Sequence, residues 1–279
     1  MTVKSRRTTL VFHDPELSLH VFHSPEESGG EAVNSVVIET ANSVVLMDQP
    51  LLYPVALEIR SFCEALGKPM RKIVISHGHP DHWFGLHAFR DIPSFASAGT
   101  IEEIAQFGKS YLQFKQSDMS ADLLPPEVAV PQTEIDSSEE IIDGLKFSWR
   151  RLKRAEYADG IYLEIPQHKV LVAADLIYNG VHLYLGQTDG GTLTGRGWLK
   201  ALRSLSASDF DVVIPGHGAV GDARLIEDCV HYIETAMPHL EADGATAETY
   251  AAAVRKAFPS YRVDELIGLT GYFAFMKQA

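Results

Sequence analysis

Three histidines and one aspartate fall within six residues of the sequence, at His77, His79, Asp81 and His82. Neutral imidazole nitrogens and carboxylate oxygens are ligands of divalent cations, and a bound cation lowers the pKa of a water molecule to about 7. Side chains two residues apart on an extended segment point to one side, so His77 and His79 face one ion. Asp81 and His82, at the start of the next helix, then face a second ion. The cluster predicts a metal centre suited to hydrolysis.

The elements around this cluster alternate between strands and helices. The segment 71–76 is a short apolar run typical of a buried strand, and it leads directly into His77. Thr100 and Glu103 resemble a capping box that opens a helix running to about Gln116. Further expected strands lie at 33–39, 43–48, 160–165, 170–174 and 211–214, and further expected helices at 54–66 and 193–205.

The last sixty residues read as helical, because Leu225, Cys229 and Ile233 recur at a spacing of four. The pattern predicts an α/β (α+β) protein with sheets covered by helices. Without an internal repeat or a low-complexity linker, one domain over 1–279 is expected, with 219–279 as a helical portion covering the site.

Composition excludes several classes of protein. The formal net charge of -13 leaves no basic stripe for a phosphate backbone, so no nucleic-acid partner is expected. No segment has the roughly 20 apolar residues of a membrane helix, and the N-terminus does not resemble a signal peptide. Only Cys63 and Cys229 are present, which suggests neither a disulfide framework nor a thiolate metal site. A cytoplasmic protein with a small-molecule substrate is expected, and a homo-oligomer is possible.

The chain resembles the metallo-β-lactamase superfamily, whose HxHxDH signature matches the cluster residue for residue. The resemblance implies a four-layer αββα sandwich with the site at one edge of two sheets. It also implies that Asp48 orients the site, that Asp175 bridges two metals, and that His217, in VVIPGHG, is the final ligand. The implied cofactors are two divalent ions, zinc first, with manganese or iron as alternatives.

One ligand departs from the family pattern. The family has a histidine before the bridging aspartate, whereas this chain reads KRAEYADG there. Glu156 lies closest to that position, and a carboxylate binds zinc, manganese or iron. Asp159 is the second candidate. The alternative is that Glu156 is a surface acid and the first metal has only two imidazoles.

Four further residues are candidates for the surroundings of the site. Tyr178 lies where some lactone-hydrolysing members of the superfamily place a tyrosine that contacts the substrate carbonyl, and its phenol could donate to an oxyanion. His182 either lines the same pocket or is a hydrogen-bonded structural histidine. Trp83 and Trp198 are expected to wall the pocket, or to belong to the core.

The expected function is hydrolysis of an ester, lactone or amide carbonyl by a metal-bound hydroxide, with Asp81 as a catalytic residue that orients it. Within the same resemblance, β-lactamase activity and an iron-dependent thiol or persulfide dioxygenase are alternatives. Oxygen-reducing di-iron members of the superfamily carry Glu where this chain has His79, which disfavours an oxygen-reducing di-iron protein. A non-catalytic metal-binding protein is the remaining alternative, and an incomplete ligand set at Glu156 would favour it.

Overall fold

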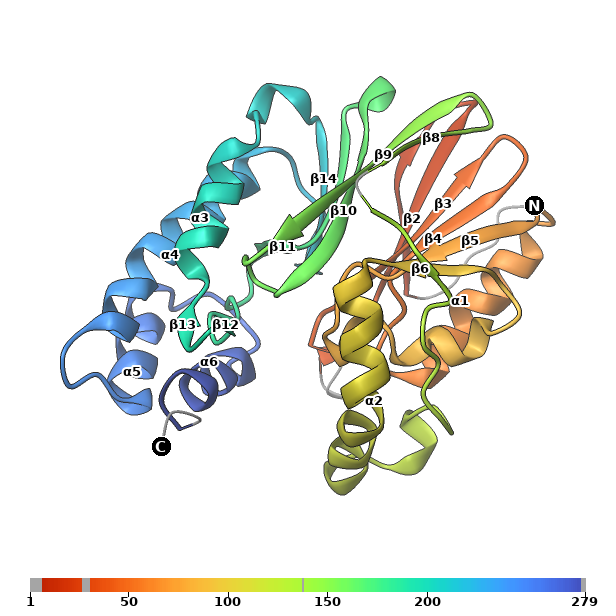
Figure 1. Ribbon diagram of the computed structural model, residues 1–279. Helices are drawn as coiled ribbons and strands as arrows, with labels where there is room; N and C mark the ends of the chain where they lie inside the picture. Colours follow the sequence, from red (N-terminus) through yellow and green to blue (C-terminus); the bar gives the residue numbers. More distant parts are fainter. Residues whose placement is uncertain (1–6, 27–30, 137, 277–279) are drawn as a thin grey trace. The chain divides into compact units, whose positions relative to one another are not determined.

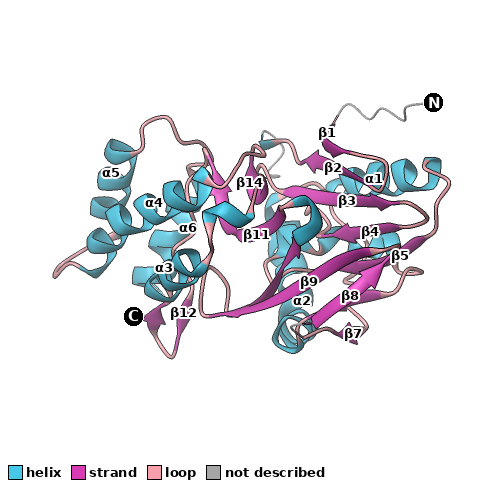
Figure 2. Ribbon diagram, turned by 90° about the horizontal axis from the view of Figure 1, so that it is seen from above, coloured by secondary structure: helices cyan, strands magenta, loops and turns pink. Residues whose placement is uncertain are grey.

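The computed structural model describes residues 7–26, 31–136 and 138–276, which form two compact units. The first unit comprises Met1–Arg151 with Asp159–His168, and the second comprises Leu152–Ala158 with Lys169–Ala279. Each unit has its own strands and helices (Figures 1 and 2). Within the described residues, no helix is both long and apolar enough to cross a membrane.

The first unit contains a seven-stranded sheet whose strands lie in chain order (Figure 2). The strands are β1 Thr8–His13, β2 Leu17–His23, β3 Asn34–Thr40, β4 Val44–Met47, β5 Met70–Val74, β6 Ser94–Ala96 and β7 Thr133–Glu134. Pairing is antiparallel from β1 to β4 and parallel from β4 to β7. The strands expected over 33–39, 43–48 and 71–76 are confirmed, with ends shifted by one or two residues.

Helix α1, Tyr53–Ala65, connects the parallel strands β4 and β5. Its buried face includes Val55, Ile59 and Phe62, which belong to the core that also contains Ile73 of β5. Pro54 lies at the helix start, where a missing N–H costs nothing. Crossover connections bring the carboxyl ends of parallel strands to one edge of a sheet, and at that edge the chain leaves β4 and β5.

Helix α2, Ala98–Asp118, begins earlier than the sequence suggested. Its N-cap is Ser97, whose Oγ accepts a hydrogen bond from the Thr100 amide at 3.2 Å. The capping box expected at Thr100 and Glu103 is therefore wrong. A serine three residues before Thr100 satisfies the free amides of the first turn, which leaves the Glu103 side chain for another contact.

Between these elements lie three short 3-10 segments, and the first unit ends with three more strands. The segments are η2 Pro80–His82, η3 Phe84–Phe89 and η4 Ala121–Leu123, and the strands are β8 Ser138–Ile142, β9 Leu145–Lys153 and β10 Asp159–Ile165. Strands β8 and β9 form an antiparallel hairpin that turns at Asp143 and Gly144, both with positive φ. The Asp143 carboxylate accepts hydrogen bonds from Thr40 and Ser43, which lowers its pKa to about 2 and ties this turn to the one between β3 and β4.

In the second unit, β11 Val170–Asn179 pairs in parallel with β14 Val212–Gly218. The strand predicted to close at Asp175 in fact continues to Asn179. Its register against β14 shifts on either side of Ala174, whose φ is 45°. Asp175 therefore lies at an irregularity inside the strand, because bulges re-aim side chains without ending a strand.

The rest of the second unit is helical (Figure 1). Its elements are α3 Gly195–Ser204, η6 Ala207–Asp209, α4 Arg224–Glu241, α5 Ala247–Ala257, α6 Glu265–Gly271 and η7 Tyr272–Met276, with the small hairpin of β12 Thr188–Asp189 and β13 Thr192–Leu193. The short segment η5 Pro166–His168, which precedes β11, belongs to the first unit. The predicted apolar face of α4 is confirmed, since Leu225, Cys229 and Ile233 are all buried. This face packs on β11, the strand that carries Asp175.

Candidate metal centre

The histidine loop of the first unit, residues 77–82, is anchored by hydrogen bonds to Asp48, which follows β4. Asp48 has φ 60° and accepts a hydrogen bond from the Ser76 amide at 2.7 Å through Oδ1. Its Oδ2 lies 2.7 Å from Ser76 Oγ and 2.9 Å from His82 Nδ1. One buried carboxylate thus fixes both ends of the loop. The backbone of the loop is also held by β10, because the Ile161 amide donates to the Ser76 carbonyl at 2.8 Å.

These hydrogen bonds select the tautomers of two imidazoles. The Ser76 hydroxyl donates its one proton to Asp48, so it can only accept from His77 Nδ1, 2.8 Å away. His82 Nδ1 likewise donates to Asp48. In both rings Nε2 then carries the lone pair, which is the form that binds a cation. A partner that fixes the distal ring nitrogen is the usual support of a metal-binding histidine.

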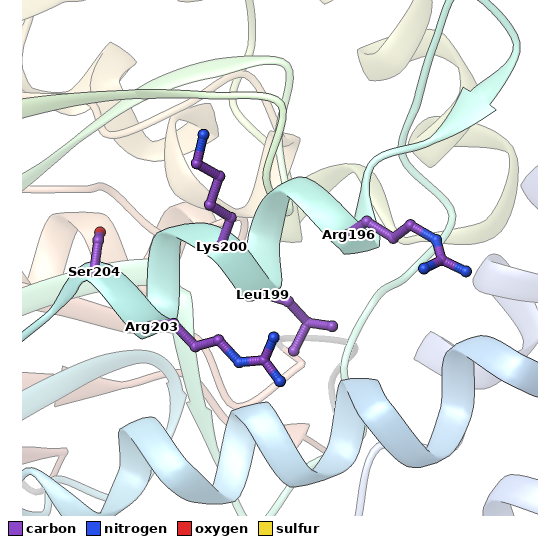
Figure 3. Close-up of a pocket in the computed structure, with 5 residues that line it drawn as sticks. All are labelled: Arg196, Leu199, Lys200, Arg203 and Ser204. Atoms are coloured by element: carbon purple, nitrogen blue, oxygen red, sulfur yellow. The ribbon is translucent and has the colours of Figure 1, made fainter.

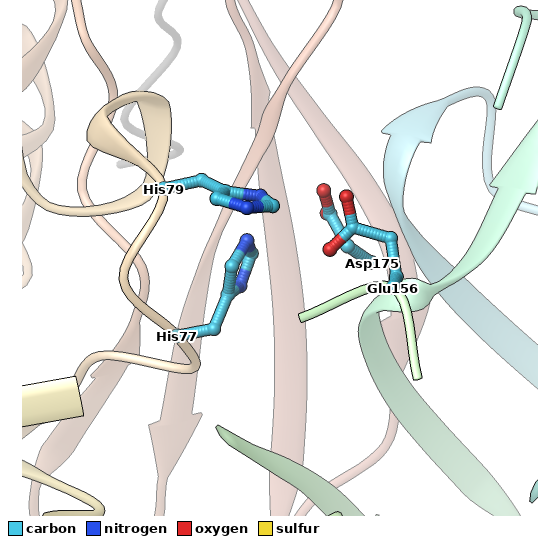
Figure 4. A group of neighbouring side chains, drawn as sticks. All are labelled: His77, His79, Glu156 and Asp175. Carbon is cyan, nitrogen blue, oxygen red and sulfur yellow. The ribbon is translucent and has the colours of Figure 1, made fainter. Parts of the chain in front are cut away.

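The imidazole rings of the loop lie against one another. The His77 ring centroid is 4.6 Å from that of His79 and 4.3 Å from that of His82, and Figure 4 shows the His77 and His79 rings in contact. Asp81 adds a carboxylate, with Oδ2 3.4 Å from His82 Nε2. Three imidazoles and a carboxylate are thereby concentrated on one loop, as the sequence predicted.

Gly78, between two of these histidines, is held from two sides. Its carbonyl accepts a hydrogen bond from Trp83 Nε1 at 2.9 Å, and a Cβ at this position would clash with the carboxylate of Glu103 on α2. Trp83 is fully buried, so its observed contacts are those of a support for the loop. Trp198 supports the backbone of β11 in the second unit, where its Nε1 donates to the Leu176 carbonyl at 2.9 Å. Their role as pocket walls stays a prediction.

In the second unit, two buried carboxylates share one phenol. The Tyr178 hydroxyl lies 2.7 Å from Asp175 Oδ2 and 3.1 Å from Glu156 Oε1, and its single proton can be donated to either. Both acids are about 1% exposed, and Figure 4 shows their carboxylates side by side. Buried like charges are costly without a proton or a cation to offset them. Glu156 is therefore not a surface acid, the alternative that the sequence left open.

His217 completes this group of side chains. Its Nε2 lies 3.2 Å from Asp175 Oδ2, and its ring stacks on Tyr178 with centroids 4.7 Å apart. The glycines on either side permit this approach of β14 to β11. A Cβ on Gly216 would overlap the Asp175 carboxylate, and one on Gly218 would overlap the Asn179 carbonyl.

Asp159, the second candidate for the missing ligand, has a different environment. Its carboxylate accepts two hydrogen bonds from Arg151, at 2.9 and 2.6 Å, and one from the Gly99 amide at the start of α2. A bidentate guanidinium and a helix N-terminus together occupy its lone pairs. These contacts favour Glu156 over Asp159 as the ligand.

His182 is hydrogen-bonded to the aromatic side chains of the helical part. Its Nδ1 lies 3.0 Å from the Tyr232 hydroxyl on α4, its ring packs on Tyr261, and its amide donates to the Arg262 carbonyl. Burial lowers its pKa, while Asp264 opposes the shift. Of the two interpretations of this residue, the contacts are those of a structural histidine.

Two supporting residues were missed from the sequence. Ser76 orients His77, and its position directly before the histidine was the available signal. Cys229 of α4 contacts the Tyr178 backbone, with Sγ 3.3 Å from the amide and 3.4 Å from the carbonyl. Burial raises the pKa of this thiol to about 12, so it stays protonated and can donate. No sequence pattern indicated that contact.

Helix α3 also carries a hollow whose lining includes none of the candidate ligands. It is lined by Arg196, Leu199, Lys200, Arg203 and Ser204 (Figure 3). Arg196 and Arg203 form ion pairs with Glu241 and Glu234 of α4. The hollow offers no histidine or carboxylate as a ligand. The side chains that qualify as candidate ligands are instead His77, His79, Glu156, Asp175, Asp81, His82 and His217.

Known proteins share the sequence pattern and the fold. A family model described as the metallo-beta-lactamase superfamily matches residues 28–217, more than half of the chain. The linear primary-alkylsulfatase of Pseudomonas sp. (strain ATCC 19151) is 24% identical over 241 residues, which cover 74% of this chain and 43% of that protein. The chain therefore spans less than half the length of this curated relative.

Two solved structures illustrate the shared fold. The metallo-beta-lactamase from Pontibacter korlensis has a TM-score of 0.63 at 18% identity, covering 81% of this chain and 99% of its own. The stereoselective inverting sec-alkylsulfatase Pisa1 from Pseudomonas sp. has a TM-score of 0.64 at 16% identity, covering 97% of this chain and 50% of its own. Identities this low speak for the fold alone, the mixed α/β sandwich that the sequence predicted.

Proposed function

Because this chain belongs to the metallo-beta-lactamase superfamily, we propose that it is a metal-dependent hydrolase whose two ligand sets bind the same pair of divalent cations. The first unit supplies His77, His79, Asp81 and His82, and the second unit supplies Glu156, Asp175 and His217. The observation that carries this proposal is the pair of buried carboxylates, Asp175 and Glu156, that share the Tyr178 hydroxyl. A cation offsets their charge more completely than one shared proton.

The donor atoms fit the proposed cations. Imidazole nitrogens with carboxylate oxygens suit zinc, manganese or iron, and zinc is the first choice for a hydrolytic centre. When bound, such ions would acidify a water molecule and polarise the bond to be cleaved. The chain's own residues orient the site: Asp48 and Ser76 fix the imidazoles, and Tyr178 holds the two carboxylates with its proton.

We propose a sulfate ester as the substrate, cleaved by water to an alcohol and hydrogen sulfate. The curated relative supports this class, since it is described as a linear primary-alkylsulfatase. Charge supports it too. Three ligand carboxylates against two divalent ions leave about one positive charge, which the single negative charge of a sulfate monoester neutralises.

A carboxylic ester or lactone is the second candidate, because Tyr178 occupies the position that suggested a donor to a carbonyl oxygen. Its hydroxyl proton lies between Asp175 and Glu156, which leaves less of it for a substrate. This arrangement favours the sulfate ester.

The proposal is tested by metal analysis and turnover of the same preparation. Purified protein should contain close to two transition-metal ions per chain and hydrolyse decyl sulfate faster than a p-nitrophenyl ester, an acyl lactone or a chromogenic cephalosporin. Asp81→Asn and His217→Ala should each lower turnover at least a hundredfold, while His239→Ala, at an exposed histidine of α4, leaves it unchanged. Turnover that survives in both variants would contradict the site. Iron with oxygen consumption and no hydrolysis would indicate a dioxygenase.

A further inference from the structure

Helix α2 carries an aromatic face whose two end rings are exposed, while the middle ring also packs against the hydrophobic core of the first unit. Phe107 is 43% exposed and Phe114 is 62% exposed, and the half-buried Tyr111 lies between them. Residues spaced by four and three lie on one side of a helix, so the three rings form a continuous row. The Phe107 and Tyr111 ring centroids are 6.3 Å apart. We call Phe107, Tyr111 and Phe114 the aromatic row.

The aromatic row begins one helical turn beyond Glu103, which packs against the histidine loop. Glu103, one turn before Phe107, packs so closely on Gly78 that a Cβ there would clash with it. Tyr111 directs its hydroxyl toward Glu103 Oε1 at 3.4 Å, so the ring face and not the hydroxyl is what the row presents. On the neighbouring side of the helix, Gly108 lies close enough to Trp83 that an added Cβ would be 3.1 Å from the indole. The same helix therefore contacts the loop and carries the row away from it.

The row and the turn before it suit an extended chain. At about 1.5 Å per residue, the row itself rises about 10 Å from Phe107 to Phe114, and Glu103 lies about 6 Å further toward the loop. A substrate whose charged head group lies at the histidine loop can lay an alkyl chain of about that length along the row. Exposed aromatic side chains in water gain free energy when an apolar group covers them.

We propose that the aromatic row of α2 binds the alkyl chain of the ester substrate and so sets a preference for long-chain esters. This inference rests on the proposed function. It assigns a binding surface to the alkyl chain, the part of the substrate that the metal ligands would not contact. The occupant is an alkyl chain because the row starts one helical turn from Glu103, which packs against the loop that would hold the head group. A second copy of the chain or another protein would have no reason to begin there.

The test uses two measurements on full-length, metal-loaded protein. The first is kcat/KM for sulfate esters from hexyl to dodecyl, which should rise about twofold per added methylene, since full burial of a methylene is worth roughly fourfold and the row is open on one side. The second is the Kd of dodecyl sulfonate below its micelle concentration, measured by titration calorimetry. The carbon–sulfur bond of the sulfonate is not hydrolysed, so binding is read without turnover.

The double variant Phe107→Ser/Phe114→Ser should lose most of the chain-length dependence and bind dodecyl sulfonate at least tenfold more weakly. Phe107→Leu/Phe114→Leu should recover part of both. The control Leu57→Ser/Ile141→Ser removes apolar side chains of matching exposure, 45% and 63%, from α1 and β8. It should behave as the parent.

Each other result has a distinct meaning. Hydrolysis with an unchanged chain-length dependence in the serine variant would overturn this inference and leave the proposed function standing. Sulfonate binding that depends on the row, with no ester hydrolysed, would overturn the proposed function and keep the row as an apolar binding face. A lower oligomeric state in the serine variant alone, seen by light scattering, would assign the row to contact between copies and overturn the inference.

Discussion

At the scale of single residues, the histidine loop is held by a chain of hydrogen bonds from two residues that are not candidate ligands, Asp48 and Ser76. Asp48 accepts from Ser76, and Ser76 accepts from His77, so a serine hydroxyl decides which nitrogen of a ligand carries the lone pair. Outer partners of this kind tune metal affinity because they fix both the tautomer and the ring orientation. Ser76 is therefore as specific a test of the loop as the ligands themselves.

Replacing Ser76 by Ala should weaken metal binding about 10–100-fold, the usual loss for such an outer partner. Its hydroxyl no longer accepts from His77 Nδ1, so the ring can rotate or change tautomer. Competition with a chromophoric chelator measures the affinity. Ser61→Ala, at an exposed serine of α1, is the matched control and should bind as the parent does. Equal affinity in Ser76→Ala would show that this chain of hydrogen bonds does not support the ligand.

At the scale of elements, the segment after β11 is anchored to the helical part through His182. The imidazole contacts Tyr232 of α4, and the carboxylate of Asp264 lies 3.5 Å from Nε2, where it pairs with Arg255. Burial is the largest cause that lowers the pKa of His182 below its ordinary 6.5. The folded protein thus holds His182 in the neutral form.

This preference makes stability depend on pH. When folding lowers the pKa of a histidine, its contribution to the stability of the folded state is fully present above about pH 6.5, the pKa in the unfolded chain. The contribution is lost as the pH falls toward the pKa in the folded state, because the unfolded chain takes up the proton first. Urea unfolding between about pH 7 and pH 5 should show a falling free energy in the parent. His182→Gln, which keeps a partner for Tyr232, should show a shallower fall, and His239→Gln the parental one. An unchanged slope in His182→Gln would rule out this role.

The elements themselves were largely predictable from the sequence, because apolar runs and turn residues are local signals. The strand before His77 and the buried face of α4 were both predicted correctly. The start of α2 was not, because Ser97 and Thr100 are both acceptable caps, and it is Ser97 that accepts from the backbone of the first turn. The continuation of β11 beyond Asp175 was also missed, since a bulge at Ala174 has no signature in sequence.

Candidate ligands could be proposed from the sequence where residue type alone carries the chemistry. His77 and His217 are examples, because few other residues bind a cation through a neutral nitrogen. Supports such as Cys229 were not, because their role depends on long-range packing of α4 on β11. Glu156 is an intermediate case: spacing suggested it, and its contact with Tyr178, together with the Arg151 contacts of Asp159, separates the two acids.

At the scale of the whole molecule, the chain belongs to the metallo-beta-lactamase superfamily, and we propose that Glu156 stands where the family pattern has a histidine. That exchange lowers the positive charge of the proposed centre and suits an anionic ester over a neutral one. It also makes Glu156 one of the two carboxylates that share the Tyr178 hydroxyl, beside Asp175. The account as a whole therefore depends on cations that are shared by ligands from both units.

Anomalous X-ray scattering from crystals of the metal-loaded protein, recorded at the absorption edge of the bound metal, tests this most directly. Two peaks are predicted, one within bonding distance of His77 Nε2, His79 and Glu156, and one within bonding distance of Asp81, His82 and His217, with Asp175 touching both. Peaks bound by the histidine loop alone, or no peak beside Glu156 and Asp175, would contradict the proposed centre.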